Sequence, residues 1–307
     1  MHTVIIGVGG VGGYFGGKIS NSNQKVTLVA RGQHLEAIQN NGLQVKSIQG
    51  DFVTHPYMVT DDIGEVEKAD LILICTKSWQ VIAAAKMVIP LLKEGTVVMP
   101  LQNGADNIEK LLSVLPPKHV VGGLCKIYSK IEDYGVISHF GHDPEVVFGE
   151  IDKNKTERIQ KIKQLFDTAG FRNTISEDIY VDIWSKFMFI ATVSGLGALT
   201  RITIGEMYEN IGTKSILEQT ATEIFKVGMA KGVQLPDDLV SRIMSFIGKQ
   251  PYDSTASTQR DILEGRPSEL DNFNGFIVKE GEKLGIETPV NSFIYSCLQP
   301  IEAKARS

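Results

Sequence analysis

A glycine-rich turn directly after the first strand-like segment constrains the fold of this chain most strongly. Residues 4–6 are a short apolar run, and residues 7–12 read G-V-G-G-V-G, the pattern G-x-G-x-x-G, at the start of a helix expected over residues 11–21. In this context Gly7 permits a tight turn, and Gly9 lets backbone amides approach an anion. The anion then lies at the helix N-terminus, where free N–H groups and the helix dipole favour it. The predicted dinucleotide-binding residues are Gly7, Val8, Gly9, Gly10, Val11 and Gly12, and the alternative is a glycine turn that binds no ligand.

The residue after the second strand-like segment indicates which dinucleotide this is. Residues 25–30 are followed by Arg31, where NAD enzymes place an Asp or Glu that binds the ribose 2′-hydroxyl. A guanidinium pairs with a 2′-phosphate through charge-assisted hydrogen bonds, whereas a carboxylate would repel it. The sequence therefore predicts NADP(H) as cofactor, with Arg31 binding it; the alternative is a solvated surface arginine.

Strand and helix patterns alternate through the first half of the chain. Residues 71–75 and 96–99 are continuously apolar, as strands buried on both faces are, and helical patterns over residues 80–92 and 107–114 follow them. Such alternation predicts the α/β class, with an N-terminal Rossmann-type, doubly wound parallel sheet. Antiparallel additions to that sheet are expected over residues 120–123, 135–140 and 146–149, before a helix over residues 155–169.

Beyond residue 176 the pattern is almost wholly helical. The expected helices cover residues 179–199, 204–231, 237–248, 257–264 and 270–284, with a last one after Asn291, and Gly232, Gly248 and Gly285 are expected at helix C-termini. We predict a Rossmann-type NADP-binding domain over residues 1–176 and an all-helical substrate and catalytic domain over residues 177–307. The length of 307 residues agrees with two domains, because single cores stop growing at about 250–300 residues.

Composition excludes several other classes of protein. The net charge of −5 gives no reason to expect nucleic acid or an anionic membrane as partner, and the three cysteines are too dispersed for a disulfide framework or a metal site. The apolar run over residues 187–199 is shorter than a membrane span, and the N-terminus lacks the basic segment of a signal peptide. We expect a cytoplasmic protein without a metal. A homodimer is compatible with this sequence.

One charged residue interrupts a long apolar helix. Residues 183–196 contain Lys186 as their only charge. Burying an unpaired ammonium is costly, so it should have a partner or line a wet cleft, unless it extends from the helix end into solvent. A positioned ammonium can stabilise the negative charge on a carbonyl oxygen that accepts hydride, and can donate the proton.

A candidate carboxylate lies in the segment over residues 265–271. Ser268 is expected to cap the following helix and to place Glu269 and Asp271 in its first turn, where the helix dipole favours acids. From the residues alone, these acids need serve only that helix end.

Together these motifs resemble the ketopantoate reductase (2-dehydropantoate 2-reductase) family. The resemblance runs over nearly the whole chain and rests on ordered motifs: GVGGVGGYFGG, CTKSWQ, LQNG, WSKF and EGRPSELDNFNGF. It implies NADPH-dependent reduction of ketopantoate to pantoate, a step towards pantothenate and coenzyme A.

The resemblance also implies roles for individual residues. Lys186 takes the place of the general acid, and Glu269 that of the acid which binds substrate and cofactor. Lys77 and Asn103 take the places of the residues beside the nicotinamide and its ribose, and Ser257 that of the serine which contacts the substrate carboxylate. The alternatives are a solvated strand-end lysine at Lys77, a turn former at Asn103 and a helix N-cap at Ser257.

The chain departs from the family pattern on the lysine's own helix. Well-studied members carry two asparagines one and two turns beyond the lysine, where this chain has Ile190 and Ser194, and a further asparagine is replaced near Ile204. Lys186, Ile190 and Ser194 fall on one helical face, so Ser194 remains a candidate substrate-binding residue. Ketopantoate, a more apolar 2-keto acid and a 3-keto acid stay open as substrates. A non-catalytic NADP-binding sensor is the alternative of another class.

Overall fold

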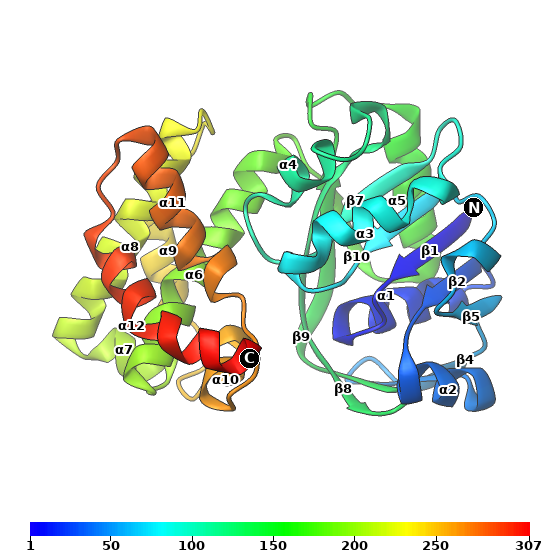
Figure 1. The fold of residues 1–307 in the computed structure, drawn as a ribbon, viewed down its shortest axis with the longest axis horizontal. Helices are drawn as coiled ribbons and strands as arrows, with labels where there is room; N and C mark the ends of the chain where they lie inside the picture. The colour runs from blue at the N-terminus through cyan, green and yellow to red at the C-terminus, as the bar shows by residue number, and fades with distance from the viewer. The chain divides into compact units, whose positions relative to one another are not determined.

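The computed structural model describes residues 1–307 and divides them into two compact units (Figure 1). The first unit comprises Met1–Gln102 and Asp106–Ile179, and the second comprises Tyr180–Ser307 together with Asn103–Ala105. The predicted division into two domains has a single boundary, after residue 176. It does not describe the three-residue segment that joins the second unit, which becomes important for the candidate site.

A five-stranded parallel sheet forms the centre of the first unit, in the order β5-β2-β1-β6-β7. Its strands are β1 (His2–Ile6), β2 (Lys25–Val29), β5 (Met58–Thr60), β6 (Leu71–Ile74) and β7 (Val97–Pro100). Every pairing between neighbours is parallel. The expected α/β fold with a Rossmann-type sheet is confirmed.

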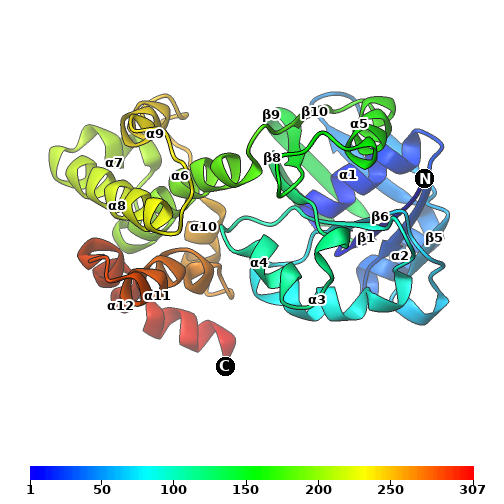
Figure 2. The same ribbon diagram turned by 90° about the horizontal axis from the view of Figure 1, so that it is seen from above.

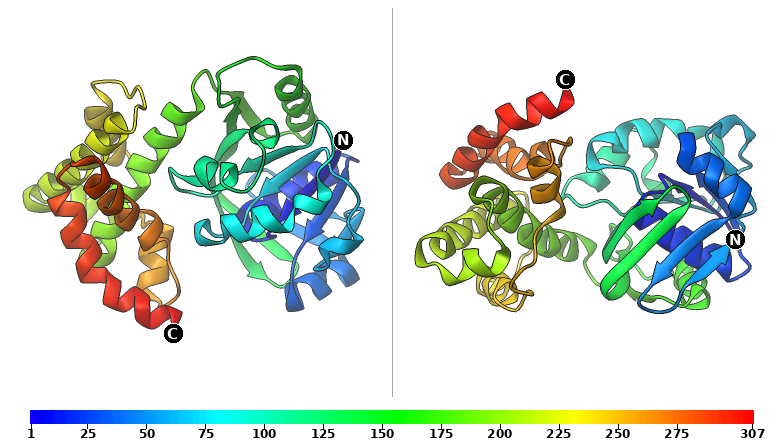
Figure 3. Two further views of the ribbon diagram at one scale, coloured as in Figure 1. Left: turned by 45° about the horizontal axis from the view of Figure 1, so that its top comes forward. Right: turned by 90° about the horizontal axis from the view of Figure 1, so that it is seen from below.

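The expected antiparallel additions to this sheet are wrong, because those residues build a second sheet. Strands β8 (Gly122–Asp133) and β9 (Val136–Gly149) form a long antiparallel hairpin. On its other side β9 pairs in parallel with β3 (Leu43–Ser47) and with β10 (Arg172–Ile175), and β3 pairs with β4 (Phe52–Thr54). The hairpin and the β3 region lie side by side in Figure 3. An isolated β-bridge joins Val120, just before β8, to Val98 in strand β7 of the parallel sheet.

Helix α1 (Gly10–Asn21) packs against both sheets, and its glycines make this possible. A Cβ at Gly16 would lie 2.9 Å from Cγ1 of Ile5 in the parallel sheet, and a Cβ at Gly17 would lie 3.1 Å from Cγ2 of Val45 in the second sheet. These distances are shorter than ordinary carbon–carbon contacts, so a side chain on either face would push a sheet away from the helix.

Four more α-helices belong to the first unit. They are α2 (Gly32–Asn41), α3 (Val81–Met87), α4 (Asn107–Leu112) and α5 (Glu157–Ala169). The single helix expected over residues 80–92 is wrong: α3 ends at Met87, and a separate 3₁₀ turn, Ile89–Leu91, follows. Pro90 lies in that turn, and a proline lacks the N–H that an α-helix needs at this point.

The second unit is all-helical, as expected (Figures 1 and 2). Its α-helices are α6 (Ile179–Thr200), α7 (Ile204–Glu209), α8 (Ile211–Ala230), α9 (Leu239–Ile247), α10 (Ser257–Leu263), α11 (Asn274–Leu284) and α12 (Pro289–Arg306). The single helix expected over residues 204–231 is wrong, because Asn210 interrupts it. The Asn210 side chain accepts hydrogen bonds from the N–H groups of Gly212 and Thr213, and so caps α8.

The three glycines expected at helix C-termini differ in what they do. Gly285 ends α11 in the left-handed conformation, with φ of 68°. Gly232, with φ of 87°, follows Lys231, the C-cap residue of α8. Gly248 is the C-cap residue of α9 and has a right-handed helical backbone conformation. Only the first two positions need glycine for its backbone freedom.

Helix α6 provides much of the apolar core of the second unit. Trp184 and Phe187 are buried on it and meet edge to face, with ring centroids 5.7 Å apart. Phe187 also packs against Phe276 of α11 at 5.9 Å. By length and composition α6 passes as a membrane span, yet 67% of its most apolar window is buried within the protein, as in a core helix.

Candidate active site

The glycine turn has the geometry of an anion cradle. After β1, Gly7 has φ of +93°, a conformation that favours glycine, and its N–H donates to the carbonyl of Val29 at 3.2 Å. Gly9 occupies the N-cap position of α1, and no protein atom lies within 4 Å of where its Cβ would stand. The start of α1 thus has room beside Gly9, and the N–H groups of a first helical turn lack partners within the helix, which fits the phosphate groups of a dinucleotide.

Arg31 lies at the end of the strand beside this turn. It follows β2 and occupies the N-cap position of α2, with extended backbone. Its side chain is exposed and makes no hydrogen bond or ion pair within the chain. The guanidinium therefore keeps all of its donors for a ligand such as a 2′-phosphate.

A buried histidine outside every sequence motif connects the start of α2 to the β8–β9 hairpin. The N–H of Gly135 donates to Nδ1 of His34 at 3.0 Å. Burial lowers the pKa of His34, so the ring is neutral near pH 7 and carries its proton on Nε2. The contact joins residues 101 positions apart in the sequence.

Lys77, which the resemblance places beside the nicotinamide, lies just beyond the carboxyl end of β6. It is exposed and precedes a 3₁₀ turn, Ser78–Gln80. Its ammonium lies 5.8 Å from the centroid of the Trp79 ring. The position at the end of a central parallel strand is where ligands of open α/β sheets bind, and the role of Lys77 stays a prediction.

The ammonium of Lys186 has a defined partner in the second unit. Its Nζ donates to Oδ1 of Asn103 at 2.6 Å, and both side chains are half-buried. Asn103 belongs to the short segment Asn103–Ala105 that joins the second unit after β7. The sequence predicted both residues for the site, but not this contact between them. The alternative of a lysine that extends from the helix end into solvent does not describe this geometry.

The positions one and two turns beyond the lysine carry little hydrogen-bonding capacity. Ile190 is half-buried, and Ser194 is fully buried with an Oγ that has no hydrogen-bond partner in the structure. The neighbouring Gly195 lets Oδ1 of Asn274 from α11 approach α6 closely, and that Oδ1 is also buried without a partner. Substrate binding by Ser194 stays a prediction, and Asn274 is a polar group near this helix that the sequence reasoning missed.

Glu269 lies in a tight turn rather than in the first turn of an α-helix. It is 6% exposed and precedes the 3₁₀ turn Leu270–Asn272. Ser268 Oγ accepts from the N–H of Leu270 at 3.2 Å, so its capping role is confirmed in part, and it also donates to the carboxylate of Glu302. Asp271 accepts a hydrogen bond of 2.7 Å from the hydroxyl of Tyr295. Burial, and after it this hydrogen bond, raise the pKa of Tyr295 to about 12.

Ser257 is the first residue of α10, whose N-cap is Ala256. Because Ala256 is the N-cap, Ser257 is not the helix cap that was its alternative role, and its side chain is exposed. Its proposed contact with a substrate carboxylate stays a prediction. The first unit thus contains the glycine turn, Arg31 and Lys77, and the second contains Asn103, Lys186, Ser194, Ser257 and Glu269.

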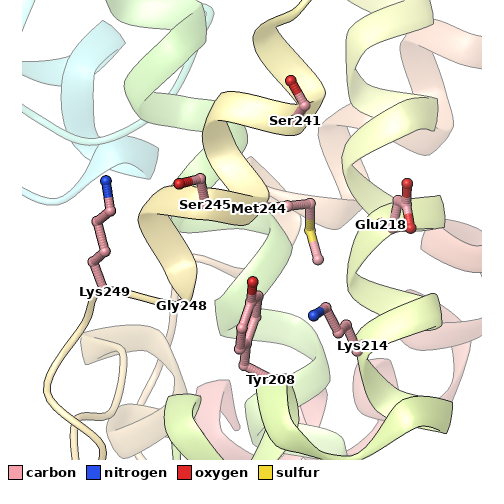
Figure 4. A pocket seen from close by; sticks show the side chains of 8 residues that line it. All are labelled: Tyr208, Lys214, Glu218, Ser241, Met244, Ser245, Gly248 and Lys249. Atoms are coloured by element: carbon pink, nitrogen blue, oxygen red, sulfur yellow. The ribbon is translucent and has the colours of Figure 1, made fainter.

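A separate pocket of about 500 Å³ lies among α7, α8 and α9, and none of the predicted site residues lines it (Figure 4). Lys214 lies in it with its Nζ 4.0 Å from the centroid of the Tyr208 ring. Met244 is its only buried lining residue. Because no buried polar group points into this pocket, it lacks the fixed donors and acceptors that orient a bound ligand.

Comparison with known proteins identifies the same family over both halves of the chain. The model of ketopantoate reductase PanE/ApbA matches residues 3–153, and the model of its C-terminal part matches residues 178–302. An uncharacterized oxidoreductase, YkpB, from Bacillus subtilis is 29% identical over 99% of this chain and 100% of its own length. A 2-dehydropantoate 2-reductase from Nostoc is 26% identical over 99% of this chain and 96% of its own. The crystal structure of a PanE/ApbA family ketopantoate reductase from Ralstonia eutropha, 30% identical, superposes with a TM-score of 0.91 over 100% of both chains.

Substitutions at two glycines of the turn, Gly12 and Gly9, should separate an effect on folding from an effect on nucleotide binding. A methyl group at Gly12 would overlap the carbonyl oxygen of Gly7 and lie 2.9 Å from Cβ of Cys75. Gly12→Ala should therefore lower the free energy of unfolding, measured without nucleotide, by about 1–3 kcal/mol. Gly9→Ala, whose methyl meets no protein atom, should leave that energy within about 0.5 kcal/mol of wild type yet weaken NADPH binding about tenfold. Equal effects of the two substitutions on folding would contradict this geometry.

Proposed function

Since this chain belongs to the ketopantoate reductase family of oxidoreductases, we propose that it is a 2-dehydropantoate 2-reductase that uses NADPH. The reaction converts ketopantoate to pantoate on the way to pantothenate and coenzyme A. The observation that carries this proposal is the Lys186 ammonium, held by Asn103 Oδ1 at 2.6 Å on an otherwise apolar stretch of α6.

Lys186 acts as the general acid. NADPH, when bound, supplies the hydride to the 2-keto carbon. As negative charge develops on the carbonyl oxygen, the ammonium stabilises it and donates the proton from Nζ, which gives the 2-hydroxy acid. Lysine then regains a proton from solvent. The hydrogen bond to Asn103 keeps Nζ in one place, so that little reorganisation is needed when the charge appears.

Glu269 binds the substrate together with Lys186. It is 6% exposed and lies in a segment whose neighbours are fully buried, so its carboxylate is an acceptor with a restricted position. A buried acceptor of this kind suits a hydroxyl group of the keto acid, because an analogue without the hydroxyl would lose that hydrogen bond.

NADPH rather than NADH is the proposed cofactor because of Arg31. Its side chain lies at the end of β2 with no partner in the chain. No carboxylate replaces it there, so a 2′-phosphate meets charge of the opposite sign.

A more apolar 2-keto acid is the second candidate substrate, and the residues beyond Lys186 favour it. Ile190 cannot form a hydrogen bond, and Ser194 is fully buried. A pocket lined in this way discriminates by shape rather than by hydroxyl groups, and one methylene there is worth only about 1–3 kcal/mol.

A panel of keto acids tests the proposed function. We expect NADPH oxidation with ketopantoate at a kcat/KM at least about tenfold above those for phenylpyruvate and acetoacetate, a difference of about 1.4 kcal/mol in transition-state binding. Preference for the apolar acid would favour the second candidate. Tight NADPH binding without oxidation by any keto acid would favour a sensor.

Loss of the ammonium should remove turnover while the cofactor still binds. Lys186→Met keeps an unbranched side chain one atom shorter and removes its charge, and we expect kcat to fall about 10²–10⁴-fold, the usual contribution of a general acid. The Kd for NADPH, measured by nucleotide fluorescence, should stay near wild type. Lys226→Met, an exposed lysine on α8, is the control. An unchanged kcat in Lys186→Met would reject Lys186 as the proton donor.

Removing the guanidinium at the end of β2 should narrow the cofactor preference. Arg31→Ala should raise the Kd for NADPH about 10- to 100-fold, because charge-assisted hydrogen bonds to the 2′-phosphate contribute about 1.5–3 kcal/mol. The Kd for NADH should change little. Arg172→Ala, an exposed arginine of the same unit, should alter neither value. If the ratio of the two constants does not move in Arg31→Ala, the cofactor assignment is wrong.

A further inference from the structure

The C-terminal helix holds the turn that carries Glu269. We propose that α12 positions the Glu269 carboxylate for the keto acid, and that Glu302 and Tyr295 are the positioning residues. The inference rests on the proposed function in one respect, namely that Glu269 binds the substrate. The contacts themselves are independent of that role.

Glu302 binds every donor that the residue before Glu269 offers. The N–H of Ser268 lies 3.0 Å from one carboxylate oxygen of Glu302 and 3.1 Å from the other, and the Ser268 hydroxyl donates to the second oxygen. Glu302 is 3% exposed and Ser268 fully buried. Hydrogen bonds to a buried carboxylate are among the stronger ones in proteins, because water does not solvate the buried charge.

Arg306 completes this arrangement one helical turn later. Its Nε donates to Oε1 of Glu302 at 2.6 Å, and its Nη2 donates to the carbonyl oxygen of Ser268 at 2.8 Å. The N–H, the carbonyl and the hydroxyl of Ser268 are thus all bound to α12. A single helix fixes the backbone that immediately precedes Glu269.

Tyr295 fixes the other side of Glu269. Its hydroxyl donates to Oδ1 of Asp271 at 2.7 Å. Tyr295 and Glu302 are seven positions apart on α12, which places them on one face of the helix, two turns apart. Between the two anchors, the carbonyl of Glu269 accepts the N–H groups of Asn272 and Phe273, both at 3.0 Å.

These contacts leave Glu269 little freedom beyond its own side-chain torsions. Leu270, which follows it, is fully buried in the apolar core of the second unit. Ion pairs and buried polar groups are not needed to fold such a turn, since apolar anchors would serve as well. Their concentration on the two neighbours of one acidic residue points to control of where that carboxylate lies.

Glu302→Gln is the first test. Every group around the Glu302 carboxylate is a donor, so the amide nitrogen of glutamine must face a donor and the clamp opens. We expect hydrogen exchange to rise in a peptide over residues 264–273. The kcat/KM for the keto acid should fall about 10- to 100-fold, as misplacement of a binding group by an ångström does, while the Kd for NADPH is unchanged.

Two further variants guard against simple loss of folding. Tyr295→Phe removes one hydroxyl and should lower kcat/KM about 3- to 10-fold, the effect of one hydrogen bond. Glu280→Gln is the control, because it neutralises another carboxylate of the second unit. Glu280 forms ion pairs with Lys231 and Lys283, away from the Glu269 turn. It should leave both kcat/KM and exchange over residues 264–273 at the wild-type values. A loss in Glu280→Gln equal to that in Glu302→Gln would overturn the inference.

A double-mutant cycle separates positioning from general stability. If Glu302 acts through Glu269, adding Glu302→Gln to Glu269→Gln should change kcat/KM by less than about twofold, whereas independent effects would multiply. Multiplying effects, or a turn that stays protected from exchange in Glu302→Gln, would overturn the inference. Faster exchange in Glu302→Gln with wild-type kcat/KM in Glu269→Gln would instead reject the substrate-binding role of Glu269 in the proposed function.

Discussion

Close packing of one helix between two sheets sets the geometry of the first unit. Helix α1 starts at the glycine turn, so the distance from helix to sheet decides where its first N–H groups lie. Gly16 permits contact with the parallel sheet, and Gly13 permits contact with the second, where a Cβ would lie 2.6 Å from Cγ1 of Ile137. Overpacking at such contacts costs about 1–3 kcal/mol. The position of Gly9 at the start of this helix therefore depends on glycines that lie farther along it.

In the second unit the corresponding constraint is the lone ammonium of an apolar helix. An ammonium removed from water needs an acceptor, and the chain supplies one from the segment Asn103–Ala105 after β7. This hydrogen bond, together with Ala105 in the apolar core of the second unit, joins the segment to the later helices. A neutral amide oxygen suits a proton donor, because it orients the ammonium without neutralising its charge.

Helix α12 of the second unit forms hydrogen bonds that involve several acidic residues. Glu302 and Tyr295 on α12 bind the two sides of the Glu269 turn. The start of the same helix is fixed by Glu223 of α8, whose carboxylate accepts the N–H groups of Val290 and Asn291 at 2.8 and 2.9 Å. Because both ends of α12 are held by buried carboxylates, its polar face can serve as a fixed support for the turn.

Much of the architecture followed from local patterns. The glycine turn, the alternation of strands and helices in the first half, the helical second half and the single lysine of α6 are all properties of short stretches, and backbone sterics or hydrophobic periodicity act over such stretches. The second sheet did not follow, because β3 joins it by pairing with β9, as between Gln44 and Val136, and these residues lie far apart in the sequence.

The sequence by itself determined the dinucleotide-type turn, the arginine beside it and the presence of one lysine that an apolar helix must accommodate. Only the tertiary structure decided what surrounds these groups. The acceptor of the Lys186 ammonium lies 83 residues away, and the carboxylate that binds Ser268 lies 34 residues away. No local pattern records such pairs, because the free energy of a buried hydrogen bond depends on which segments the fold brings together and not on their order in the chain.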